Sequence, residues 1–99
     1  MTQEKYLIRH SSTAYRIIDG VAMIVGGSES KLRTLNKAGT LIWELADGKH
    51  SLSEIINQIC QDFEVDYTTA ASDTDAFVRE LESKNMLSIV DSPVALETR

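Results

Sequence analysis

The sequence predicts an α+β fold in which a three-stranded antiparallel β-meander is followed by three helices. Two observations carry this prediction. The hydrophobic pattern changes at about residue 36 from alternation, which is typical of strands, to a repeat of about 3.6 residues, which is typical of amphipathic helices. Signals for tight turns and for helix ends separate the segments on both sides of this change. The 99 residues are expected to form one domain (1–99), with its core within about residues 6–90 and a short tail at 91–99.

Residues 14–18 (AYRII) and 21–25 (VAMIV) are the two strands of the predicted hairpin. Asp19 and Gly20 stand between them, and this dipeptide is a strong signal for a two-residue type I′ turn. A looser turn, GGSES, leads to a third strand over residues 31–35 (KLRTL), which a meander places at an edge of the sheet. Residues 6–10 (YLIRH) fit either a fourth strand or an ordered lead-in.

Residues 36–46 form the first predicted helix. Asn36 is a good N-cap, and Asp47 and Gly48 form a C-cap pair. The apolar residues of this segment recur at helical spacing, but Trp43 lies off their stripe. For such a residue, packing on a neighbouring element is a more common role than contact with a ligand.

A capping box formed by Ser51 and Glu54 opens the second predicted helix. Its apolar residues lie on one face, which is therefore expected to be buried. These residues are Leu52, Ile55, Ile56, Ile59, Cys60 and Phe63.

Asp66 or Ser72 caps the third predicted helix. Asn85 fits the left-handed position just after the helix end, and Met86 and Leu87 would fold back over the last turn. The residues expected on the inner side of this helix are Ala70, Thr74, Phe77, Val78 and Leu81.

Three short helices with tight turns on a small sheet suit a winged helix-turn-helix, an architecture that often binds DNA. The charges argue against that use. Residues 1–50 hold seven Lys or Arg against five Asp or Glu, a balance of +2, whereas residues 51–90 hold two against eight, a balance of −6. The third helix would present mostly acidic side chains to a phosphate backbone, which would repel them. These are Asp73, Asp75, Glu80 and Glu82, with only Arg79 and Lys84 against them. No nucleic-acid partner is expected.

No catalytic or metal-binding constellation is expected either. His10 and His50 have no Cys or carboxylate at the spacing of metal ligands. The single cysteine, Cys60, falls on a core position, where a free thiol behaves as a small hydrophobe. Gly26 and Gly27 do not have the spacing of a phosphate-binding loop. The chain is therefore predicted not to be an enzyme and to need no cofactor.

The location expected for the chain is the cytoplasm. No apolar run is long enough to span a membrane, and the N-terminus lacks the apolar region and cleavage site of a signal peptide. A single cysteine allows no internal disulfide, which also favours a reducing compartment.

The predicted edge strand allows two interpretations. Lys31 and Arg33 could protect the edge against aggregation. Alternatively, an extended peptide could add a strand to this edge, a mode called β-augmentation. Backbone groups would then supply affinity and side chains of the adjacent helix would supply selectivity. A basic edge favours a peptide with acidic residues.

The segments LNKAGTLIWELADGKHSLSEIINQICQDFEV and SDTDAFVRELESKNML resemble the PqqD-like family, named for pyrroloquinoline quinone biosynthesis protein D. The resemblance covers about residues 6–90 and includes the hairpin YRIIDGVAMIV. Two positions depart from the family's pattern: Thr74 stands where Val is usual, and Asn85 stands where Gly is usual. Asn tolerates the left-handed conformation that Gly would adopt. The matching residues are Leu35, Asn36, Ile42, Trp43, Leu45, Asp47, Gly48, Ser51 to Ile55, Asp73, Phe77, Leu81 and Leu87.

The resemblance implies a RiPP recognition element. Such a winged-helix-like domain binds the leader of a ribosomally synthesised precursor peptide and presents it to a modifying enzyme, often a radical S-adenosylmethionine (SAM) enzyme. The product would be pyrroloquinoline quinone or another modified peptide. In the family the leader lies as an added strand beside the third strand, in a groove against the third helix. The peptide-binding residues that this implies are Lys31, Leu32, Arg33, Thr34 and Leu35 on the strand and, from a helical wheel, Asp73, Ala76, Phe77, Glu80 and Lys84 on the helix.

Some alternatives stay open at this point. Phe77 also fits a position wholly inside the core. The chain could instead be a winged-helix transcription regulator or a protein–protein adaptor. In each case a monomer or a weak homodimer is expected.

Overall fold

The computed structural model describes residues 4–28 and 31–93, and in it the predicted hairpin is present. Strands β2 (Ala14–Ile18) and β3 (Val21–Val25) pair in antiparallel register, from Ala14 opposite Val25 to Ile18 opposite Val21. Asp19 and Gly20 have φ values of 54° and 77°, and two positive φ values are what a type I′ turn requires. The turn prediction is confirmed.

Strand β4 (Arg33–Thr34) is shorter than the predicted strand over 31–35 but lies at the edge of the sheet, in the order β2-β3-β4. Its end has a clear cause. The Leu35 N–H still donates to the Ala22 carbonyl, at 2.9 Å, but the Ala22 N–H donates to the Thr40 hydroxyl, at 2.8 Å. A helix side chain thus takes the donor that would have continued the ladder.

The three predicted helices are α1 (Lys37–Leu45), α2 (Leu52–Phe63) and α3 (Tyr67–Ser83). The predicted N-caps Asn36 and Ser51 are confirmed, the latter in a capping box with Glu54. Asp66, rather than Ser72, caps α3. Buried stripes follow the predicted spacing, although Phe63 at the end of α2 is 38% exposed.

Helix α3 ends as the sequence predicts. Asn85 adopts the left-handed conformation, with φ of 62°. The N–H groups of Asn85 and Met86 donate to the carbonyls of Glu82 and Leu81, at 3.0 and 2.9 Å, which is the pattern of a Schellman motif. Met86 and Leu81 are both buried, and contact between these two positions is typical of the motif.

A second antiparallel sheet was not predicted. It consists of β1 (Tyr6–Arg9), β5 (Asp47–Ser51) and β6 (Leu87–Val90), in the order β5-β1-β6. Two expectations are thereby corrected. Asp47 and Gly48 do not cap α1, whose C-cap is Ala46, but begin β5. Leu87 does not only cover the last turn of α3, because it starts a strand that pairs with β1.

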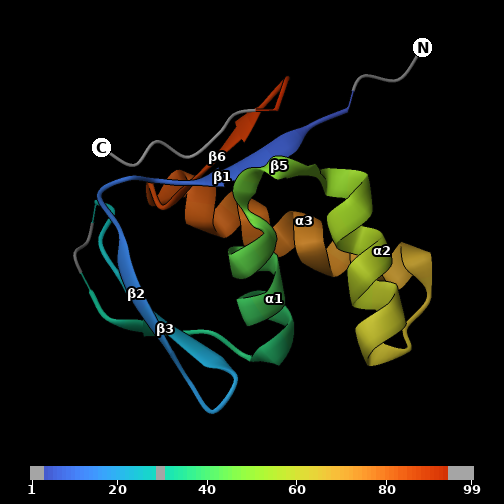
Figure 1. The fold of residues 1–99 in the computed structure, drawn as a ribbon, viewed down its shortest axis with the longest axis horizontal. Coiled ribbons are helices and arrows are strands. Elements are labelled where there is room, and N and C mark those ends of the chain that lie inside the picture. The colour runs from blue at the N-terminus through green and yellow to red at the C-terminus, as the bar shows by residue number, and fades with distance from the viewer. Residues whose placement is uncertain (1–3, 29–30, 94–99) are drawn as a thin grey trace.

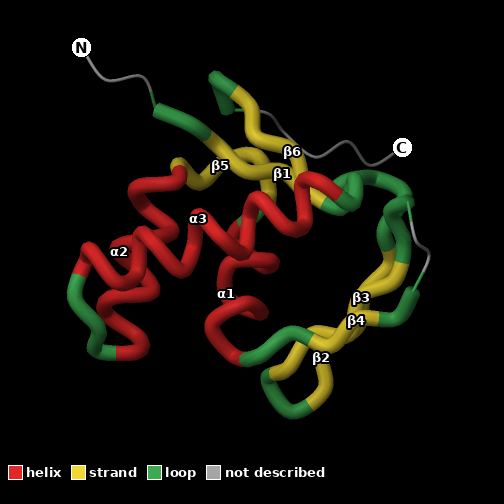
Figure 2. Tube along the Cα trace, turned by 180° about the vertical axis from the view of Figure 1, so that it is seen from behind, coloured by secondary structure: helices red, strands yellow, loops and turns green. Residues whose placement is uncertain are grey.

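Helix α1 lies between the two sheets (Figure 1), because it contacts β3 of one and β5 of the other. In Figure 1, β1, β5 and β6 cross above α1 and α3, whereas the β2–β3 hairpin lies beside α1. Seen from behind in Figure 2, α3 passes in front of α1 and α2. Apolar residues of both sheets and all three helices form one core, with Trp43 fully buried in it. The core role expected for Trp43 is confirmed.

Arg9 of β1 completes the end of α1. The last turn of α1 contains no basic residue. The Arg9 guanidinium donates to the carbonyls of Trp43 and Glu44, at 2.7 and 3.0 Å, and so places a positive charge where the helix dipole favours one. This contact attaches the second sheet to α1.

Candidate functional site

The edge strand β4 directs one set of backbone groups away from the sheet. Because the Leu35 N–H bonds to β3, the alternation of an antiparallel ladder directs the backbone groups of Arg33 to β3 as well. The N–H and C=O of Thr34 then point outward. This is the arrangement that an added strand requires.

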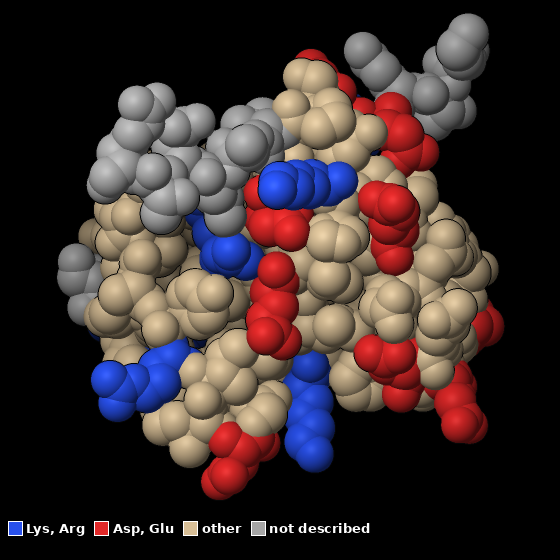
Figure 3. All heavy atoms as spheres, viewed as in Figure 1, with Lys and Arg blue, Asp and Glu red and all other residues tan. Residues whose placement is uncertain are grey.

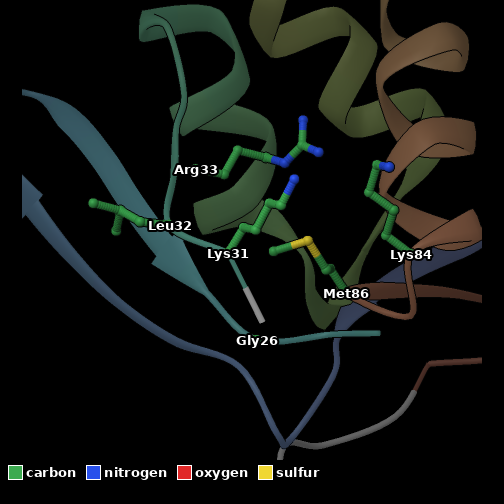
Figure 4. A pocket seen from close by; sticks show the side chains of 6 residues that line it. All are labelled: Gly26, Lys31, Leu32, Arg33, Lys84 and Met86. Atoms are coloured by element: carbon green, nitrogen blue, oxygen red, sulfur yellow. The ribbon is translucent and has the colours of Figure 1, made fainter. Parts of the chain in front are cut away.

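Side chains of this segment alternate between two faces. Leu35 is only 5% exposed and belongs to the core, so it supports the groove from below and does not form its surface. Leu32 is 69% exposed. In the close view of Figure 4, Lys31 and Arg33 extend toward the end of α3, whereas Leu32 points the other way.

An ion pair joins the strand to the helix. Arg33 Nη1 lies 2.8 Å from Glu80 Oε2, and the two side chains are 29% and 51% exposed. Partly exposed pairs of this kind add little to the free energy of folding, typically about 0–1 kcal/mol. The pair matters for geometry: it places Arg33 of the predicted strand set next to Glu80 of the predicted helix set.

The loop after β3 is attached to the end of α3. Ser28 donates its N–H and its hydroxyl to the Lys84 carbonyl, at 2.8 and 3.0 Å. Gly27 adopts φ of 72°, and a Cβ there would overlap the Lys84 carbonyl and come within 2.7 Å of Met86 Cγ. The sequence analysis assigned this glycine to a turn alone, but the close approach of two backbones also requires it.

A shallow basic depression lies between this loop, β4 and the end of α3 (Figure 4). It has a volume of about 240 Å³. Three of its six lining residues are cationic: Lys31, Arg33 and Lys84. The others are Gly26, Leu32 and Met86. Lys84 thus meets the strand residues as predicted, whereas Gly26 and Met86 were not assigned to the site.

The remaining helix residues of the prediction lie at a second cavity, which we call the helical pocket. It has a volume of about 400 Å³ and is lined by residues of α1, α2 and α3, mostly apolar. Asp73, Ala76 and Phe77 are among them. Phe77 is half-buried and packs on the core, so it is neither wholly inside nor freely exposed. Of the predicted helix residues, Lys84 therefore lines the basic depression, and Asp73, Ala76 and Phe77 line the helical pocket. Glu80 lines neither cavity but pairs with Arg33.

Acidic side chains dominate another face. In Figure 3 the side that α2 occupies shows Asp and Glu without Lys or Arg. The sequence accounts for this, because no Lys or Arg occurs between Lys49 and Arg79. Such a surface repels nucleic-acid phosphates.

The histidines and the cysteine have ordinary partners. His10 Nδ1 lies 2.8 Å from the Ser12 hydroxyl, and His50 Nδ1 lies 3.0 Å from Asp47 Oδ1. Burial would raise the pKa of Asp47, but hydrogen bonds from His50 and from the Lys49 N–H outweigh it and lower that pKa below its ordinary value. Cys60 packs against the core. Within residues 4–28 and 31–93, no group of three His, Cys, Asp or Glu is placed to hold a metal ion.

Comparison with known proteins adds two similarities. The family model described as "Coenzyme PQQ synthesis protein D (PqqD)" matches residues 11–87. The chain is also similar to TbiB1, whose structure was solved in complex with the TbiA(beta) leader peptide. The two chains are 27% identical and have a TM-score of 0.73, over 82% of this chain and 94% of TbiB1. No curated protein matches the chain. None of the helices in the described part of the chain is long and apolar enough to cross a membrane.

Proposed function

The chain belongs to the PqqD family, and from this premise we propose that it is a peptide chaperone of RiPP biosynthesis. It binds the leader of a ribosomally synthesised precursor peptide and presents the peptide to a modifying enzyme. The observation that carries the proposal is the outward-facing edge of β4, placed beside α3 in a fold shared with a protein that was solved with a leader peptide.

In this proposal the leader adds a fourth strand to the sheet β2-β3-β4 at the free edge of β4. The outward N–H and C=O of Thr34 bond to its backbone, which makes this part of the binding insensitive to sequence. The cations of the basic depression, Lys31, Arg33 and Lys84, select for a carboxylate on the peptide. Asp73, Ala76, Phe77 and Glu80 contact the peptide from α3.

The chemistry belongs to the partner enzyme, for which we propose a radical SAM enzyme. The chain itself acts without catalysis, as a monomer or weak homodimer. Because the precursor is made on ribosomes, the place proposed for this step is the cytoplasm. The pathway leads to pyrroloquinoline quinone or to another modified peptide.

An amide-shift titration tests the proposal. The ¹⁵N-labelled chain is titrated with a synthetic leader from a small open reading frame beside the gene, and with a scrambled peptide of the same composition as control. We expect shifts clustered at residues 31–35 and along one side of residues 73–84 for the leader only. Shifts confined to residues 51–70 would show that the site is on another face. No shift with any neighbouring candidate would rule out leader recognition.

A further inference from the structure

Strand β2 forms a second free edge of the sheet β2-β3-β4, opposite the edge at β4. Ile17 lies opposite Ala22 of β3. The N–H and C=O of Ala22 bond on its other side, to Thr40 and Leu35. Ile17 therefore belongs to a non-hydrogen-bonded pair, and the alternation of an antiparallel ladder gives Tyr15 the same orientation. The N–H and C=O groups of Tyr15 and Ile17 thus point away from the sheet, and no described residue bonds to them.

The side chains of this edge are exposed and mostly apolar. All five residues of β2 are exposed, and the three largest apolar ones are Tyr15 at 43%, Ile17 at 37% and Ile18 at 44%. The strand contains no proline or lysine and pairs with β3 without a bulge, so the usual devices that protect an edge are missing. Such an edge is a template for pairing with another chain.

Arg16 is the charged residue of β2, and it determines which chain can pair there. Its neighbour Ile17 lies opposite the buried Ala22, so the Arg16 side chain is on the face of the sheet that points away from the core. It makes no ion pair or hydrogen bond with any described residue.

This cation disfavours a second copy of the chain at the edge. Antiparallel pairing that joins Tyr15 of one copy to Ile17 of the other puts Arg16 directly opposite Arg16 of the second copy. Like charges in that position destabilise a strand pair, whereas opposite charges stabilise it. The edge therefore favours a strand that carries a carboxylate opposite Arg16.

The β2 edge lies away from both the leader site and the acidic face. The strand order β2-β3-β4 places it at the opposite edge from β4, where the leader is proposed to add. Figure 1 and Figure 2 both show the β2–β3 hairpin and α2 on opposite sides of the molecule. A chain paired with β2 therefore leaves the leader edge free, and its carboxylate avoids the acidic residues around α2.

We propose that β2 docks an extended segment of the modifying enzyme, which adds as a strand and places a carboxylate opposite Arg16. The inference rests on the proposed function, in which the chain holds a leader and an enzyme at the same time. The sheet has two free edges, one for each partner. Contact over one short strand is at the small end of protein interfaces, which suits an enzyme that is bound and released.

Amide-shift mapping tests the location. The ¹⁵N-labelled chain, saturated with leader, is titrated with the modifying enzyme encoded beside the gene. We expect the resonances of residues 14–18 to shift, or to broaden more than the rest of the chain. Enzyme binding without an effect on these residues would overturn the inference. So would a response of residues 14–18 to the concentration of the chain alone, which would assign the edge to a second copy.

Two variants of Ile17 test strand addition by calorimetric titration with the same enzyme. Ile17→Pro removes one outward N–H at an edge that tolerates proline, and Ile17→Val keeps this N–H and a branched apolar side chain. We expect the proline variant to bind the enzyme about tenfold more weakly and the valine variant to stay within about twofold of the natural chain. Equal affinities of the two variants would overturn strand addition.

Two variants of Arg16 test the charge and keep the inference falsifiable if proline disturbs the hairpin. Arg16→Glu should weaken enzyme binding by about fivefold, because it opposes two carboxylates. Arg16→Lys keeps the positive charge and should bind like the natural chain. If both variants bind the enzyme equally well, no carboxylate lies opposite Arg16 and the inference is wrong.

Leader titrations of these variants separate the inference from the proposed function. All four substitutions lie at the edge away from β4, so the leader should shift residues 31–35 as it does in the natural chain. If the leader binds and the β2 variants bind the enzyme like the natural chain, the docking inference is wrong and leader recognition stands. If no leader binds, the proposed function fails, and the inference fails with it.

Discussion

At the scale of single residues, the buried hydroxyl of Thr74 lowers the stability of the fold. Its hydroxyl is buried without a partner, so Thr74→Val removes a desolvation cost and preserves the side-chain shape. Helix propensity changes little between these two residues. We expect Thr74→Val to raise the free energy of unfolding by about 1 kcal/mol, measured by urea denaturation at neutral pH.

Substitution of Thr40 is a control that should change the free energy of unfolding in the opposite direction. It is also buried, but its Oγ1 accepts the Ala22 N–H at 2.8 Å. Thr40→Val leaves that backbone donor unpaired and should lower the free energy of unfolding by about 1–3 kcal/mol. If Thr74→Val destabilises the chain as much as Thr40→Val does, the Thr74 hydroxyl has a hydrogen-bond partner in solution.

Asp66 gives a prediction about pH. Hydrogen bonds from Thr69, its hydroxyl first and then its N–H, lower the pKa of the Asp66 carboxyl from its ordinary value of 3.8. A depressed pKa in the folded state means that the stabilisation is complete above the unfolded-state pKa and is lost as the pH falls through the folded-state pKa. Acidification below about pH 4 should therefore remove the contribution of this cap.

Asp66→Asn isolates that contribution, because Asn is also a good N-cap but does not titrate. Urea denaturation of both proteins between pH 7 and pH 2.5 should give a constant difference in unfolding free energy above about pH 5. Below about pH 4 the natural chain should lose stability relative to the variant. Parallel curves over the whole range would show that the Asp66 carboxylate does not stabilise the N-terminus of α3.

At the scale of secondary-structure elements, the exposed edge of β4 determines whether a strand can be added. Thr34→Pro removes the outward N–H, whereas the bonds of Arg33 and Leu35 to β3 are kept. Proline is tolerated at an edge strand when its nitrogen faces away from the sheet. We expect leader affinity to fall by about tenfold, as loss of one backbone hydrogen bond and of strand geometry implies.

Calorimetric titration of a leader into Thr34→Pro and Thr34→Val measures this effect. The valine variant keeps the N–H and changes only the side chain, so its affinity should stay close to that of the natural chain. Urea denaturation checks that the proline variant is folded. Equal loss of affinity in both variants would mean that the Thr34 side chain, and not the strand edge, contacts the peptide.

The sequence predicts elements whose signals are local and misses those that depend on distant pairing. The turn at Asp19 and Gly20 and the caps at Asn36 and Ser51 are each encoded within four residues. Strand β5 is polar and contains Asp47-Gly48, a signal for a chain reversal, and its strand conformation comes from pairing with β1. Likewise β6 pairs with β1 from the opposite end of the chain, with Val90 opposite Tyr6.

The sequence likewise predicts only the locally encoded part of the candidate site. Helical periodicity is enough to place Asp73, Phe77, Glu80 and Lys84 on one stripe. It does not show that Lys84 lines one cavity and Phe77 another, because that division depends on where α1 and the loop after β3 contact the helix. The Gly26-Gly27 pair was the available signal for this contact, and only the overlap of a Cβ with α3 distinguishes it from a simple turn.

At the scale of the whole molecule, the loop after β3 fixes the sheet β2-β3-β4 relative to α3. Ser28 bonds to the Lys84 carbonyl, and Arg33 pairs with Glu80 on the same helix. The Asn85 side chain also lies 3.3 Å from the Ser28 hydroxyl. The width of the groove between β4 and α3 therefore depends on this docked loop, which is far in sequence from the helix end that it meets.

Gly27→Ala tests this dependence, and Gly20→Ala is its matched control. Both glycines have positive φ, 72° and 77°, so both variants carry the cost of an alanine in a left-handed conformation, about 1 kcal/mol. Only at residue 27 does the added Cβ also overlap the end of α3, since nothing lies within 4 Å of a Cβ at residue 20. Gly27→Ala should therefore lose more unfolding free energy than Gly20→Ala, by a further ~1–2 kcal/mol in urea denaturation.

In calorimetric titrations the leader should bind more weakly to Gly27→Ala, because the loop is displaced and the groove altered. It should bind Gly20→Ala as it binds the natural chain. Equal effects of the two substitutions on leader affinity would show that the docked loop does not set the geometry of the groove.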